Sequence, residues 1–154
     1  GMTRARRLEI LKDSRIGSYG VLAMIAAIGL RWTLFATLLP VAPLSLIAAA
    51  MLSRAGMATL MASLPFARED GLAKHVGKPP TWAVGIGLAI AVIGAALAAG
   101  PIAGLVSTIA KGAGALGVAA IAKAKIGGQT GDVLGTAQVV GELAALVTCA
   151  ALLS

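Results

Sequence analysis

Long apolar runs dominate this chain and are the feature that most constrains its fold. Runs of about 20 residues, the length that a helix needs to cross the hydrocarbon core of a bilayer, follow one another from Val21 onward. Of the 154 residues, 58% are hydrophobic and only 12% are charged, whereas soluble domains have about 25% charged residues. The composition therefore excludes a soluble globule or a disordered chain. It predicts an all-α, polytopic integral membrane helical bundle of about five transmembrane helices.

Proline, glycine and charged residues divide the apolar part of the chain into spans. Pro40 and Pro43 mark one break and Gly100-Pro101 another, because proline disfavours helical geometry in the residue before it. The polar segments 65–81 and 123–132 are predicted loops. The expected spans are 21–39, 41–64, 82–99, 102–122 and 133–153.

Residues 1–20 form a basic, amphipathic lead-in that we expect at the membrane surface, ahead of a transmembrane domain over 21–154. The chain has 13 Lys and Arg against 6 Asp and Glu, a net charge of +7. Aromatic residues make up only 3%, so platforms for stacking bases are few and we expect the lipid bilayer, and no nucleic acid, as the partner. The sequence is compatible with a homo-oligomer but does not set the oligomeric state.

The positions of the charges predict the orientation in the membrane. Basic residues gather in 1–20, 65–81 and 123–132, while the turns at Pro40 and Gly100 have none. All three charged segments then fall on one side of the bilayer, and the positive-inside rule assigns that side to the cytoplasm. We expect a multi-pass membrane protein whose charged loops are cytoplasmic.

Four charged residues, Arg31, Arg54, Lys111 and Glu142, lie inside predicted spans. Each is roughly 15 Å from the cytoplasmic end of its helix at about 1.5 Å per residue. A charge at this depth costs at least about 2.5–3.5 kcal/mol and usually faces the bundle interior. We predict that Glu142 pairs with Arg31 or Arg54, while Lys111 either shares the interior or snorkels to the interface. An alternative function is a small multispanning transporter or channel subunit that uses Arg31, Arg54 and Glu142.

The first segment whose residues could bind a ligand is KDSRIGSYG, residues 12–20. Cations and exposed backbone amides suit phosphate groups, and a carboxylate such as Asp13 is a ligand for Mg²⁺. The alternative is a basic anchor at the membrane edge, in which the two glycines only form the entry turn. The candidate substrate or phosphate contacts in this segment are Lys12, Ser14, Arg15 and Tyr19.

The second segment is KIGGQTGD, residues 125–132. Its glycines permit close approach of a ligand to the backbone, and a helix N-terminus is a site for anions. Asp132 could instead hold a metal ion that bridges phosphates. The alternative is a capped loop in which Thr130 or Asp132 begins the next helix. The candidate phosphate contacts here are Gly127, Gly128, Thr130 and Gly131.

Taken together, the two segments resemble the cobalamin synthase, or adenosylcobinamide-GDP ribazoletransferase, family. Residues 12–20 look like that family's KDSRIGxYG region, and 126–135 (IGGQTGDVLG) look like its IGGxTGDxLG region. Ser53-Arg54-Ala55, followed by an apolar stretch and Leu64-Pro65, also fits the family. The resemblance therefore adds Arg54 to the candidate substrate-binding residues.

The resemblance implies a membrane transferase that joins α-ribazole, or its 5′-phosphate, to adenosylcobinamide-GDP with release of GMP and uses Mg²⁺. Lys12, Arg15 and the backbone of 127–131 are then expected to contact the diphosphate, and Asp13 and Asp132 to bind Mg²⁺ or cap helices. No catalytic residue is assigned.

Family members carry further membrane segments and an acidic DGLAD-type motif upstream of the first segment. Here only Asp70-Gly71-Leu72-Ala73 is similar, and it follows two predicted spans. We therefore expect this chain to be the C-terminal part of a longer enzyme.

Overall fold

The computed structural model describes residues 3–13, 15–68 and 72–154, and these residues form a bundle of helices with no β-strand among them. Five of the helices are long and apolar enough to cross a membrane, which confirms the predicted polytopic bundle. The described helices are α1 (Arg4–Lys12), α2 (Ser18–Val41), α3 (Leu44–Ser63), α4 (Leu72–Val76), α5 (Thr81–Ala99), α6 (Pro101–Ile126) and α7 (Gly131–Leu153).

Several helices begin or end at other residues than the sequence predicted. α6 continues through Lys123–Ile126, which the sequence assigned to a loop, because lysine and alanine favour helix. It ends at Gly127, whose φ of 82° is the left-handed conformation typical of a residue just past a helix C-terminus. Pro40 lies within the last turn of α2 and the helix ends one residue later. The predicted loop 65–81 contains the short helix α4.

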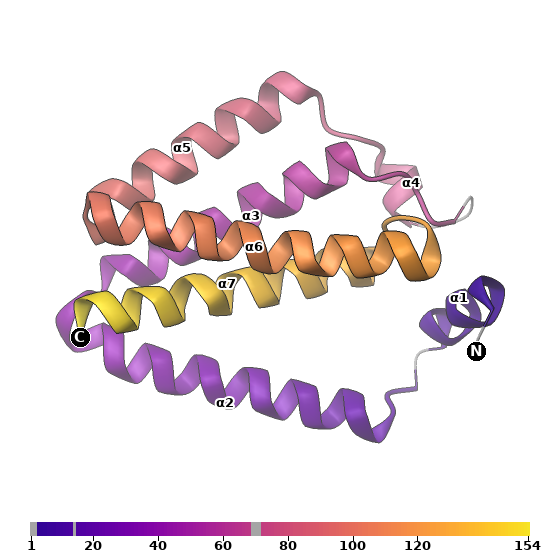
Figure 1. Ribbon diagram of the computed structural model, residues 1–154, viewed down its shortest axis with the longest axis horizontal. Helices are drawn as coiled ribbons and strands as arrows, with labels where there is room; N and C mark the ends of the chain where they lie inside the picture. The colour runs from indigo at the N-terminus through magenta and orange to yellow at the C-terminus, as the bar shows by residue number, and fades with distance from the viewer. Residues whose placement is uncertain (1–2, 14, 69–71) are drawn as a thin grey trace.

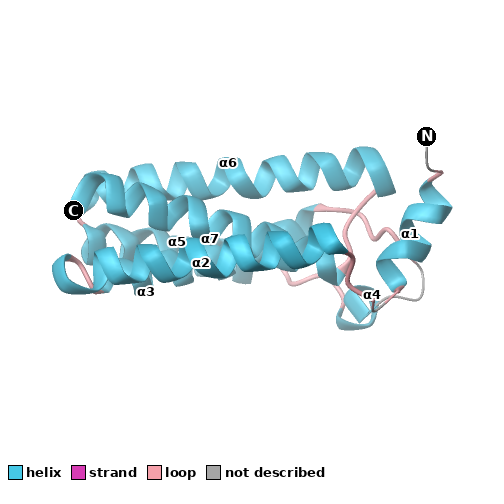
Figure 2. Cartoon of the chain, turned by 90° about the horizontal axis from the view of Figure 1, so that it is seen from below, coloured by secondary structure: helices cyan, strands magenta, loops and turns pink. Residues whose placement is uncertain are grey.

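The bundle has two chemically different ends. α1, α4 and the loop between α6 and α7 lie at one end, here called the charged end, as both views show (Figures 1 and 2). The short connections at 42–43 and at Gly100 lie at the opposite end, here called the turn end, together with the C-terminus. The three charged segments therefore lie at one end of the bundle, while their side of the membrane remains a prediction.

α6 and α7 lie side by side in the centre of the bundle, with α3 packed against both, α2 flanking α7 and α5 flanking α3 and α6 (Figure 1). Small residues and hydroxyls make these contacts, as is usual between helices in lipid. Ser53 of α3 donates to the Gln138 carbonyl of α7 at 3.0 Å. At the turn end the core includes Leu38, Ala145 and Leu146, all fully buried.

The tight connection between α5 and α6 depends on glycine at two places. Gly100 has a φ of 84°, which reverses the chain, and Pro101 begins α6. A Cβ added at Gly104 would lie 2.7 Å from the backbone nitrogen of Ala96, so the two helices approach more closely than any larger residue allows.

We predict that Gly104→Ala destabilises the bundle by about 1–3 kcal/mol, the usual cost of forcing extra volume into a packed interface. Gly112→Ala is the matched control, because a Cβ at Gly112, on the same helix, meets nothing within 4 Å. Thermal unfolding in detergent should show a lower midpoint for Gly104→Ala and an unchanged or higher one for Gly112→Ala. Equal midpoints would contradict the proposed close approach.

Candidate functional site

The charged end of the bundle is held together by arginines that donate to backbone carbonyls. They join α1 to the end of α6 and to the segment after α3. The Lys125 carbonyl lies in the last turn of α6, where carbonyls lack partners within the helix and favour cations. The three bonds are Arg4 Nη2 to Ala67 O at 3.3 Å, Arg7 Nη1 to Lys125 O at 3.1 Å, and Arg68 Nη2 to Leu8 O at 2.6 Å. The predicted surface lead-in is thus docked onto the bundle.

Gln129 fastens the two loops of the charged end to each other. Its backbone accepts from Ala67 N at 3.0 Å and donates to Pro65 O at 2.8 Å. Its side-chain Nε2 donates to the carbonyls of Met61 and Leu64, both at 2.9 Å, where α3 ends. The side chain is 1% exposed. Sequence reasoning assigned no role to Gln129, because its partners come from a segment more than 60 residues away.

The residues around Gln129 also have structural roles in the loop between α6 and α7. Gly127 ends α6, and a Cβ there would lie 2.9 Å from the Arg4 guanidinium carbon. A Cβ at Gly128 would overlap the Pro65 carbonyl. Thr130 is buried, and its hydroxyl accepts from Val133 N at 3.3 Å, so it caps α7. Gly131 has open space around it. Phosphate contact by these four residues stays a prediction.

The segment after α1 brings Lys12, Asp13 and Arg15 together around a surface pocket of about 320 Å³. The Arg15 guanidinium donates to both carboxylate oxygens of Asp13, at 2.7 Å for the closest pair, and the Arg15 backbone N–H also donates to Asp13 at 3.0 Å. These bonds lower the pKa of Asp13 and raise the pKa of Arg15, so both are charged at neutral pH. Ser14 lies outside the described residues, and Tyr19 is 90% exposed on α2.

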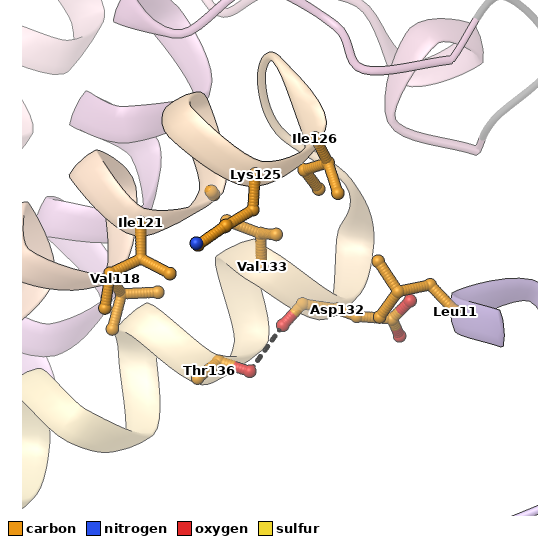
Figure 3. Close-up of a pocket in the computed structure, with 9 residues that line it drawn as sticks. Leu11, Val118, Ile121, Lys125, Ile126, Asp132, Val133 and Thr136 are labelled. Carbon is orange, nitrogen blue, oxygen red and sulfur yellow. Dashed lines mark hydrogen bonds between the residues drawn. The ribbon is translucent and has the colours of Figure 1, made fainter. Parts of the chain in front are cut away.

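Asp132 lines two pockets. One, of about 290 Å³, lies between α1, α6 and α7, with Lys125 and Asp132 at its rim and Leu11 of α1 beside the Asp132 carboxylate (Figure 3). The other, of about 660 Å³, lies between α2 and α7 and reaches from Asp132 to Arg31. Asp132 is exposed, and within the described part of the chain its carboxylate forms no hydrogen bond or ion pair.

The charges inside the spans separate into three cases. Arg31 Nη2 lies 3.2 Å from Glu142 Oε1, which confirms the predicted pair between α2 and α7. Arg54 is not the partner: it is exposed at mid-helix, away from both loops, and donates to Ala50 O on its own helix at 3.2 Å. Lys111 is only 6% exposed and packs inside the bundle, so the snorkelling alternative is wrong.

The described residues contain no group of three or more His, Cys, Asp or Glu side chains that could together hold a metal ion. Mg²⁺ usually needs only one or two carboxylates and takes its other ligands from water and substrate phosphates. The exposed carboxylate of Asp132 fits that donor set. Both oxygens of Asp13 already accept from Arg15, so a metal ion there would have to displace the guanidinium. Residues 69–71, with most of the DGLA similarity, lie outside the described residues.

The comparison with known proteins decides the family. Residues 1–150 match the family described as cobalamin-5-phosphate synthase. The chain belongs to the cobalamin-5-phosphate synthase family. This membership favours the enzyme interpretation over a transporter or channel subunit. No solved structure matches the chain.

Similar proteins in this family are named adenosylcobinamide-GDP ribazoletransferase. The protein of Bradyrhizobium diazoefficiens is 43% identical over 153 residues, which cover 98% of this chain and 59% of that relative. The protein of Sinorhizobium sp is 40% identical over 156 residues, covering 95% and 60%. The protein of Brucella canis is 40% identical over 154 residues, covering 94% and 59%. The chain therefore spans about three fifths of the length of these synthase relatives.

We predict that Gln129→Leu loosens the charged end, because the partly buried carbonyl of Met61 and the buried carbonyl of Leu64 would lose their donor, at a cost of about 1–3 kcal/mol. Gln138→Leu is the matched control, since the Gln138 side chain forms no hydrogen bond with any described residue. Hydrogen exchange followed by mass spectrometry should show faster exchange in 64–68 and 127–130 for Gln129→Leu alone. Identical exchange in both variants would refute the role given to Gln129.

Proposed function

We propose that this chain carries the phosphate-handling part of an adenosylcobinamide-GDP ribazoletransferase, which joins α-ribazole, or its 5′-phosphate, to adenosylcobinamide-GDP and releases GMP. The observation that carries the proposal is that the two motif segments lie at the same end of the bundle (Figure 1). Leu11, next to the KDSRIGSYG segment, and Asp132, from the IGGQTGD segment, line the same pocket (Figure 3). Family membership and the names of the relatives support the same reaction.

The cations of the charged end are the proposed contacts for the diphosphate. Lys12 and Arg15 border one pocket, and Lys125 borders the pocket that contains Asp132. Asp13 holds the Arg15 guanidinium by a two-oxygen interaction, so its role in this proposal is to position Arg15. Phosphoryl transfer depends mainly on positioning and on stabilising charge, and fixed cations supply both.

Asp132 is the proposed Mg²⁺ ligand. Its carboxylate is exposed and unpaired among the described residues, and it lies in the first turn of α7, within reach of a ligand that also approaches Lys125. Bound at this carboxylate, Mg²⁺ would neutralise charge on diphosphate oxygens. The neighbouring Thr130 hydroxyl is already used as the helix cap, so Asp132 remains available for the metal.

The same proposal places the charged end at the cytoplasmic face of the bacterial inner membrane. The gathering of the basic segments at one end of the bundle supports it, because positively charged loops are retained on the cytoplasmic side. A homo-oligomer stays a prediction.

The proposal predicts that Asp132→Asn in the full-length protein lowers the rate of GMP release by about 10²–10³, as expected when one strong electrostatic contact to the reacting group is lost. It should also raise the Mg²⁺ concentration needed for half-maximal rate. The assay supplies adenosylcobinamide-GDP, α-ribazole and Mg²⁺ and measures GMP.

Lys78→Gln is the control, because Lys78 is an exposed charged residue of the same end that lines neither pocket used in the proposal. This variant should retain the wild-type rate. A wild-type rate and Mg²⁺ dependence in Asp132→Asn would defeat the assignment of Asp132.

A further inference from the structure

Lys111 is a buried cation without a counter-ion in the described part of the chain. It lies near the middle of α6, and only 6% of the residue is exposed. Among the described residues, its ammonium forms no hydrogen bond and no ion pair. Since removing a charge from water is costly unless it is paired, an anionic partner would stabilise such an ammonium.

Two glycines on neighbouring helices make room for the Lys111 side chain. A Cβ added at Gly56 of α3 would overlap the Lys111 ammonium. A Cβ added at Gly141 of α7 would lie 3.2 Å from Lys111 Cγ. The aliphatic stem of Lys111 therefore passes along α7, and its charged end lies against α3 where a side chain is missing.

The ammonium borders a cavity of about 250 Å³ between α3, α5 and α6. A water molecule takes up roughly 30 Å³ in the liquid, so the cavity is large enough for a carboxylate and several carbon atoms. Apart from Lys111 its walls are mostly apolar. Two threonines also line it, Thr59 and Thr108, and each hydroxyl donates to a carbonyl of its own helix.

No described carboxylate at mid-span is available to pair with Lys111. Within the spans the only described carboxylate at this depth is Glu142, which pairs with Arg31. The middle of the bundle therefore holds an uncompensated positive charge at Lys111, and the second unpaired cation, Arg54, faces outward rather than toward this cavity.

We propose that this cavity binds a single carboxylate on the Lys111 ammonium. One ammonium neutralises one negative charge, which matches a carboxylate better than a doubly charged phosphate. Because the threonine hydroxyls are already donating, Lys111 is the donor available in the cavity, and the apolar walls suit the carbon chain that bears the acid. The carboxylate comes either from an Asp or Glu elsewhere in the full-length protein or from a free amphiphilic acid such as a fatty acid.

The test uses dicyclohexylcarbodiimide, an apolar reagent that activates a carboxyl group for attack by a neighbouring amine; an amide forms and one carboxyl oxygen leaves in dicyclohexylurea. Full-length protein, purified from membranes, is treated with the reagent, digested and analysed by mass spectrometry. We expect Lys111 to carry an amide. An amide to an Asp or Glu peptide identifies a carboxylate of the protein, and an amide to a fatty acid identifies a free amphiphile.

Three variants make the result decisive. Arg31→Lys places an amine against Glu142, so an amide to Glu142 shows that the reagent acts at this depth. Lys111→Arg keeps the charge but removes the amine, and the Lys111 product should vanish. Lys123→Arg removes an exposed lysine of the same helix and should leave that product unchanged. An unmodified Lys111 in a sample where the Glu142 control reacts would overturn the proposal, whatever the transferase assay shows.

Discussion

The ion pair between Arg31 and Glu142 is the interaction on which the position of α2 depends. The hydrocarbon core offers no water to a charged group, so an arginine and a glutamate at mid-span must find each other inside the protein. They come from α2 and α7 and lie 3.2 Å apart. The only buried residues of α2, Leu34 and Leu38, lie on the turn-end side of this pair. Apolar packing thus holds α2 at the turn end, and the ion pair holds it at mid-span.

This arrangement explains the groove between α2 and α7. On the charged-end side of Arg31 no described residue of α2 is buried, and the helix diverges from α7 (Figure 1). The resulting pocket of about 660 Å³ has Arg31 at its inner end and Asp132 at its mouth. The ion pair therefore sets how far into the bundle a ligand entering at Asp132 can reach.

Hydrogen bonds to backbone carbonyls connect the loops of the charged end, whereas the Asp132 carboxylate is exposed. Gln129 and three arginines fix the loops and α1 through backbone carbonyls, which leaves few polar groups there without a partner. Gln129 Oε1 is without a hydrogen-bond partner in the described part of the chain, but it is buried and faces none of the pockets named above. Asp132 has an exposed carboxylate that forms no bond with a described residue, and the Lys125 side chain lines the same pocket. A site that handles diphosphate needs that combination, because catalysis of this kind relies on groups that are fixed before the substrate arrives.

The sequence predicted the features that follow from composition and periodicity. The five spans, the gathering of charged segments at one end, and the Arg31–Glu142 pair all follow from the cost of polar groups in lipid. The same reasoning missed Gln129 and the arginines of α1, because their partners are loop carbonyls that only the folded chain brings near. It also left the position of Lys111 open, since the space for that side chain depends on Gly56 and Gly141 from two other helices.

A double-mutant cycle on Arg31 and Glu142 tests the central claim most directly. The full-length protein is compared with Arg31→Met, Glu142→Met and the double variant by reversible unfolding in detergent. A real pair predicts that each single variant leaves an uncompensated charge, and that the double variant is more stable than the sum of the single losses by about 0.5–3 kcal/mol. Strictly additive losses would show that the two residues act independently and would contradict this account of how α2 is held.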